Sequence, residues 1–135
     1  MKVLLTAIFF ASVIFLLIDI IWLSFAVKVF YRPNLGQLLL DKPIIWAAVL
    51  FYLMYVAGVG IVVINPALSS TNPLLQSLII GFVFGFVAYG TYNFTNMATI
   101  KGWSPYVVLV DIFWGGFLTA TSSSIGISIA KYIFK

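Results

Sequence analysis

Two stretches of the chain each place one aspartate inside a long apolar run. LIDIIWLSF spans residues 17–25 and LVDIFWGGF spans residues 109–117, and in both the Asp is followed by Ile and, three residues later, by Trp. Asp19 and Asp111 are two of only three acidic residues in the chain. In apolar surroundings, carboxyl groups share protons, bind cations or hydrogen-bond between helices. The pair therefore marks either a ligand or proton site, or a structural contact.

The composition is that of an integral membrane protein. Hydrophobic residues make up 64% of the 135 residues and charged residues only 7%, whereas soluble domains carry about 25% charged residues. The absence of Cys and His excludes disulfides, Ser-His and Cys-His catalysis, and ordinary zinc sites. No cofactor and no metal are expected. The net charge of +4 comes from residues at the ends of apolar runs, which is typical of anchoring in a lipid bilayer and not of nucleic-acid binding.

The apolar runs predict four spans in a single domain, at about 3–27, 44–64, 74–98 and 106–130. Each has the ~20 residues that cross a hydrocarbon core, and the first is too long for a signal peptide. Short connections make neighbouring spans antiparallel, so we expect an all-α, up-down bundle of four transmembrane helices. Asp41 is expected to cap the second helix. The end of the bundle with loops 28–43 and 99–105 carries four Lys and Arg residues, and the other end carries three. This difference favours a cytoplasmic position for these loops.

The two aspartates are expected to face each other. One lies late in the first span and the other early in the fourth, so on antiparallel helices both lie about 8–13 Å inside the same membrane boundary. Two carboxyl groups held close in low dielectric are expected to share one proton. Tyr89, Asn93 and Asn96 share a face of the third span and add polar groups to that half. The predicted site comprises Asp19, Asp111, Asn93, Asn96, Tyr89, Tyr92, Trp22 and Trp114, with Arg32 and Lys101 as loop side chains able to reach it.

Small residues recur at four-residue spacing in the last two spans. Gly81 and Gly85 form one row, and Gly116, Ala120 and Ser124 form another. Such rows allow close backbone contact between helices. Packing within one chain and contact in a homodimer both remain open.

Several motifs together resemble a bacterial membrane family called domain of unknown function 2177. They are DIIW, FYRPNLG, YNFTNMATIKGW and VDIFWG, in this order, over residues 17–116. The resemblance implies a small four-span protein of the bacterial inner membrane and no established activity. In that family the third-span motif usually reads Tyr-Asp-x-Thr-Asn, so Asn93 stands where an Asp is usual. This departure argues against a metal site made of three acids.

Three functions compete. The first is a carrier or binding protein for a lipophilic or cationic small molecule, with the Asp pair binding cargo or exchanging protons. The second is a membrane enzyme acting on a lipid or isoprenoid, with the aspartates as an acid–base pair; no intramembrane protease motif or phosphate-binding cluster supports it, so we lean against an enzyme. The third is an accessory or assembly subunit. The repeated motif on opposed helices fits either an inverted duplication or convergence.

Overall fold

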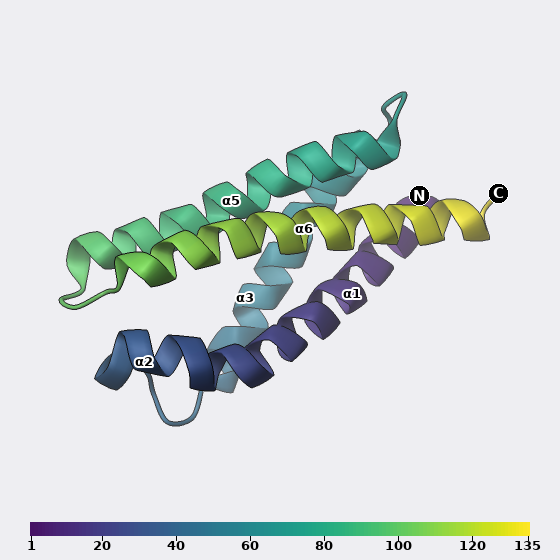
Figure 1. The fold of residues 1–135 in the computed structure, drawn as a ribbon. Coiled ribbons are helices and arrows are strands. Elements are labelled where there is room, and N and C mark those ends of the chain that lie inside the picture. The colour runs from purple at the N-terminus through teal and green to yellow at the C-terminus, as the bar shows by residue number, and fades with distance from the viewer.

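The structure, a computed structural model, describes residues 1–135 and consists of four long helical segments joined by short turns (Figure 1). Their bounds are Lys2–Leu38, Ile45–Leu68, Pro73–Thr99 and Pro105–Ile133. Each is long and apolar enough to cross a membrane, and there is no β-strand. This confirms the predicted all-α membrane fold with four spanning helices.

The first helix extends beyond its predicted end. α1 (Lys2–Ala26) passes into a π-helical turn, η1 (Val27–Tyr31), then into α2 (Arg32–Leu35) and a 3-10 turn, η2 (Gly36–Leu38). The prediction that a loop begins after residue 27 was therefore wrong. Pro33, which has no amide hydrogen to donate to the helix, directly follows the π-helical turn without ending the helix. Gly36, with a φ of +53°, ends the regular helix instead.

The second span also changes its helical geometry partway. It comprises α3 (Ile45–Gly58), a π-helical segment η3 (Val59–Ile64) and α4 (Asn65–Leu68). Asp41 does not cap this helix, because residues 42–44 separate it from the first helical residue and Ile44 occupies the capping position. Its carboxylate instead lies 3.7 Å from the Arg32 guanidinium, with the Asp side chain fully in solvent.

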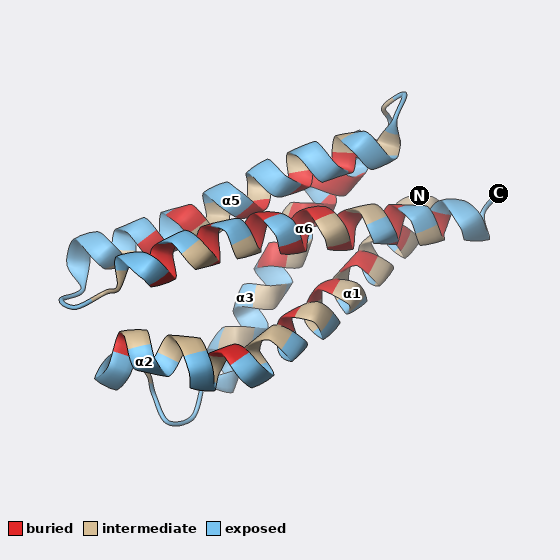
Figure 2. Ribbon diagram, in the orientation of Figure 1, coloured by how far each residue is buried: buried red, intermediate tan, exposed pale blue.

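The last two spans, α5 (Pro73–Thr99) and α6 (Pro105–Ile133), pack side by side along their length (Figure 1). A Cβ at Gly81 would lie 3.0 Å from the Ala120 Cα, and one at Gly85 would overlap the Gly115 carbonyl. Ser124 and Ser77 join their hydroxyls at 3.0 Å across the same contact. Both rows of small residues therefore make close contacts within the chain. Figure 2 shows α6 as the most buried of the long helices.

α1 crosses α6 closely at one end and diverges from it at the other. At the crossing, a Cβ on Gly126 would lie 2.6 Å from the Ala7 carbonyl oxygen and 2.7 Å from the Ala11 amide nitrogen. From there the two helices separate toward α2, while α3 runs behind them (Figure 1). The divergence widens the bundle in the half that holds Asp19 and Asp111, where it leaves space for a cavity.

Candidate functional site

The two aspartates line one cavity in the wide half of the bundle. Its volume is about 420 Å³, and all four spans contribute to its wall. Both carboxyl side chains are buried, each residue being 6% exposed. The lining residues are Asp19, Leu23, Tyr31, Phe51, Tyr52, Tyr55, Ala88, Tyr89, Tyr92, Asp111 and Trp114. The cavity thus combines two buried carboxyl groups with a mainly aromatic wall.

Asp19 receives one hydrogen bond on each carboxylate oxygen. The Tyr52 hydroxyl donates to Oδ2 at 2.6 Å, and the indole Nε1 of Trp114 donates to Oδ1 at 3.3 Å. The donors come from the second and fourth spans. Asp19 therefore ties α1 to both neighbouring helices through neutral groups.

Asp111 is held in the same way by different helices. The Tyr31 hydroxyl donates to Oδ1 at 2.5 Å, and the Asn93 amide donates to Oδ2 at 3.2 Å. Each donor is fixed in turn: Tyr31 accepts from the indole of Trp22 at 3.2 Å, and the Asn93 carbonyl oxygen accepts from the indole of Trp103 at 3.3 Å. Five residues form one chain of hydrogen bonds that ends at the turn between α5 and α6.

The tryptophans of the two repeated motifs stack on each other. The ring centroids of Trp22 and Trp114 are 4.5 Å apart and their planes differ by 21°. The indole of Trp114 bonds Asp19 directly, and that of Trp22 reaches Asp111 through Tyr31. Each Asp-x-x-Trp motif therefore supplies its tryptophan to the aspartate of the other motif. This contact explains why the motif occurs on both outer spans.

No basic side chain neutralises either aspartate. The one ion pair in the chain joins Arg32 to Asp41, outside the cavity, and Lys101 is exposed on the α5–α6 turn. Neither of the two loop cations predicted to reach the site forms an ion pair with Asp19 or Asp111. No group of three or more acidic, histidine or cysteine side chains comes together. The four donors to the carboxylates are all neutral, so no positive charge in the cavity offsets the charge of an ionised aspartate.

The remaining predicted residues divide between the cavity and its surroundings. Tyr89 and Tyr92 line the cavity without bonding either aspartate. Asn93 is fully buried, and its amide also donates to the Tyr89 carbonyl at 3.1 Å. Asn96 is only partly buried, does not bond either aspartate and does not line the cavity.

The predicted site lacked three donors, Tyr31, Tyr52 and Trp103. Tyr31 and Trp103 lie in segments that were assigned to loops, FYRPNLG and KGWSP. For Tyr31, the available signal was the apolar pattern of VFY directly after the first span, which permits the helix to continue. For Trp103, no signal in the sequence places the indole on Asn93.

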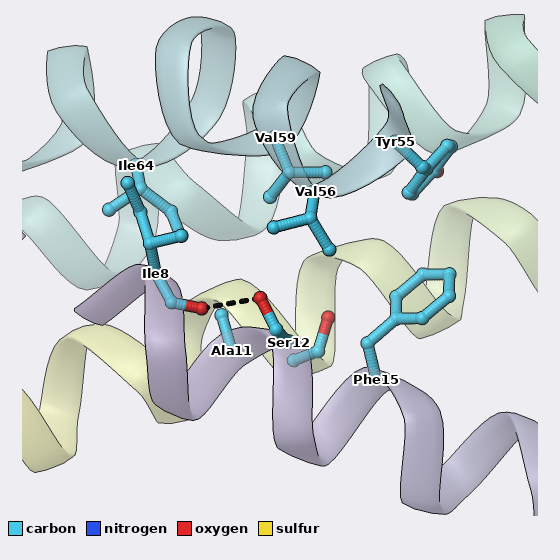
Figure 3. Close-up of a pocket in the computed structure, with 9 residues that line it drawn as sticks. Ile8, Ala11, Ser12, Phe15, Tyr55, Val56, Val59 and Ile64 are labelled. Atoms are coloured by element: carbon cyan, nitrogen blue, oxygen red, sulfur yellow. Dashed lines mark hydrogen bonds between the residues drawn. The ribbon is translucent and has the colours of Figure 1, made fainter. Parts of the chain in front are cut away.

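The opposite half of the bundle is packed tightly. Figure 3 shows a small gap there, between α1 and the second span, which holds only about 10 Å³. Its wall is apolar apart from Tyr55 and hydroxyls such as Ser12, which donates to the Ile8 carbonyl at 2.7 Å. Tyr55 lies between this gap and the cavity, and its hydroxyl meets that of Thr119 at 2.6 Å. The cavity that the aspartates line is thus separate from this gap and from the hollow of about 590 Å³ at the end of the bundle where the two termini lie.

Four apolar helices around a buried polar cavity define a multi-pass integral membrane protein. Comparison with known families assigns it more closely. The chain belongs to the family described as predicted membrane protein, domain of unknown function 2177, whose profile matches residues 4–128. Comparisons with curated proteins and with solved structures found no match.

Proposed function

We propose that the protein binds a lipophilic cation in the cavity between Asp19 and Asp111, as a small carrier or binding protein of the membrane. The observation that carries the proposal is a pair of buried carboxyl groups with no basic partner, facing about 420 Å³ of space. That volume lies within the ~300–1,000 Å³ of small-molecule sites. A cationic ligand would supply the charge that the protein itself does not place there.

The wall of the cavity supports an amphiphilic ligand. Tyr52, Tyr89, Phe51 and Trp114 present aromatic rings to the same space as the carboxyl groups. Aromatic faces attract cations by about 0.5–2 kcal/mol, the larger values holding for desolvated sites. An apolar body packed on these rings with its charge near a carboxylate would satisfy both parts of the wall.

The competing interpretation is that the carboxyl groups only join helices. Every carboxylate oxygen of the two aspartates accepts a hydrogen bond in the structure. Carboxyl groups that only join helices, as in an accessory subunit, would be bonded in this way. Interhelical hydrogen bonds of this kind contribute about 0.6–2 kcal/mol in membranes. The two interpretations differ in whether the cavity binds a cation at all.

Binding of a matched pair of ligands separates them. The probes are N,N-dimethyl-2-naphthylmethylamine, which is protonated at neutral pH, and the neutral amide N,N-dimethyl-2-naphthamide of similar size. Isothermal titration calorimetry on the purified protein in detergent should show saturable binding of the amine at least about tenfold tighter than of the amide. The variant with both Asp19→Asn and Asp111→Asn controls for partition into micelles. If the amine and the amide give equal binding heats, the aspartates do not bind a cation and serve only as contacts between helices.

We further propose the bacterial inner membrane as the location, with loops 28–43 and 99–105 on the cytoplasmic side. The support is the family resemblance and the charge count, since four Lys and Arg residues lie at that end against three at the other. Because the chain contains no Cys, single cysteines at Lys101 and Lys131 can report the orientation. A membrane-impermeant thiol reagent applied to intact cells should label the second position and not the first.

A further inference from the structure

The two aspartates are held unequally, and the difference indicates which one meets a ligand. Both donors of Asp111 belong to the five-residue chain of hydrogen bonds and have further partners of their own. Asn93 is fully buried and bonds two other groups, and Tyr31 also accepts from Trp22. Removing either donor from Asp111 would break several contacts at once.

One donor of Asp19 is held much more weakly. The Tyr52 hydroxyl makes a single hydrogen bond, to Asp19 itself. Its helix, α3, has only Tyr55 buried, while Trp46 and Met54 are 70% and 75% exposed. Burial is concentrated beyond residue 58, in the π-helical segment η3 and in α4. Tyr52 is itself only partly buried, with ring contacts to Phe15 and Phe51, so it can leave Asp19 at a smaller cost in packing than a fully buried donor.

The π-helical segment separates these two parts of the second span. Such segments inside helices frequently occur at functional sites. Before it, α3 packs loosely at the edge of the cavity. At its end and in α4, Val63, Ile64 and Ala67 are completely buried. A movement of α3 about η3 would withdraw Tyr52 and open the cavity beside Asp19.

We infer that the ligand is a protonated amine that takes the place of the Tyr52 hydroxyl on Asp19, whereas Asp111 holds helices together and does not contact the ligand. This inference rests on the proposed function. When Tyr52 leaves, Oδ2 of Asp19 loses its hydrogen-bond donor within an apolar cavity, and a buried acceptor without a donor is costly. An ammonium N–H restores both the hydrogen bond and the charge balance. A quaternary ammonium restores only the charge.

The inference is tested by adding a third probe to the same titration. The quaternary salt of the naphthyl amine carries a methyl group where the amine carries its N–H, and is otherwise the same molecule. The protonated amine should bind about tenfold tighter, since hydrogen bonds to charged groups are among the strong ones. The preference for the protonated amine over the quaternary salt should disappear in Asp19→Asn and persist in Asp111→Asn. If Asp111→Asn does not fold, the conservative variant Tyr31→Phe serves in its place and should keep the preference.

Tyr52→Phe tests the displacement step, with Tyr55→Phe as its matched control. Both tyrosines belong to α3 and line the cavity, but Tyr55 bonds Thr119 and not an aspartate. With no hydroxyl to displace, Tyr52→Phe should bind the amine about fivefold tighter than wild type, and Tyr55→Phe should match wild type within about twofold.

The possible outcomes are distinct. If the amine and the quaternary salt bind wild type equally and both exceed the amide, the proposed function stands and the inference of N–H recognition is wrong. If Tyr52→Phe leaves the affinity for the amine unchanged, the displacement step is refuted. If the preference is lost in Asp111→Asn and kept in Asp19→Asn, the two aspartates have the opposite roles. If neither cation binds better than the amide, the proposed function fails together with the inference.

Discussion

Replacing Asn93 by Leu should destabilise the protein strongly, because the amide joins three groups in a place without water. Its Nδ2 donates to Asp111 and to the Tyr89 carbonyl, and its Oδ1 accepts from Trp103. The residue is 0% exposed. Leu has the same branching but bulkier methyl groups, so the change removes the hydrogen bonds and also crowds a fully buried site.

The magnitude follows from which partners lose their hydrogen bonds. Asp111 keeps the Tyr31 donor but loses the one on its other oxygen, and an acceptor left unsatisfied in a buried site costs about 1–3 kcal/mol. Trp103 is only partly buried and can find other partners at the membrane boundary, so it adds little. The Tyr89 carbonyl still accepts the helical amide of residue 93. We expect a loss of about 2–3 kcal/mol in the free energy of unfolding.

The assay compares two identical substitutions on one helix. Asn96→Leu changes the same residue type three positions later in α5, where the side chain is partly exposed and bonds neither aspartate. Equilibrium unfolding in mixed micelles with increasing denaturing detergent should separate the two variants, with Asn96→Leu within about 0.5 kcal/mol of wild type. If both variants unfold together with wild type, Asn93 faces lipid and the hydrogen-bond chain to Asp111 does not exist.

Three further outcomes follow from the same geometry. Gly126→Ala should lower the free energy of unfolding by about 1–3 kcal/mol, because the added methyl overlaps α1. Its control is Gly90→Ala, whose added methyl would meet its nearest neighbour at 3.8 Å. This control should leave the thermal unfolding temperature unchanged or raise it. Asn93→Asp should retain the fold at low pH, where a protonated carboxyl can donate to Asp111. Its stability relative to wild type should fall as pH rises, because ionisation next to Asp111 is unfavourable in the folded state only, as pH-dependent unfolding would show. Finally, cysteines at the positions of Asp19 and Asp111 should react with a short thiol crosslinker in membranes, and pairs at unequal depth should not.

The sequence was sufficient to predict the helices and to bring the two aspartates into the same half of the bundle. Runs of apolar residues as long as the bilayer is thick admit few alternatives to spanning helices. Short turns then force the ends of the first and fourth spans to the same side, so Asp19 and Asp111 had to lie at similar depth. Both of them line one cavity in the structure. The polar character of that half of the bundle was readable from residue types and spacing alone.

What the sequence could not predict depends on local helix geometry. Pro33 and Gly36 indicated a loop, yet the π-helical turn before them continues the helix and turns Tyr31 toward Asp111. A π-helical turn changes the direction in which all later side chains point, so a spacing rule based on 3.6 residues per turn fails beyond it. Whether the small residues join helices of one chain or of two was undecidable for a similar reason. A row such as Gly81 and Gly85 specifies a close contact and not the partner.

The repeated Asp-x-x-Trp motif gains its meaning from the crossing of the outer helices. A spacing of three residues places Asp and Trp on one face of a helix. On two antiparallel helices, each face then presents a donor to the acceptor opposite. In the structure, Trp114 donates directly to Asp19. Trp22 reaches Asp111 only through the hydroxyl of Tyr31. Because Tyr31 occupies the Asp111 side, the exchange is not symmetrical. Oδ2 of Asp19 is bonded only by the hydroxyl of Tyr52 on the loosely packed α3, and the ligand proposed above would take the place of that hydroxyl.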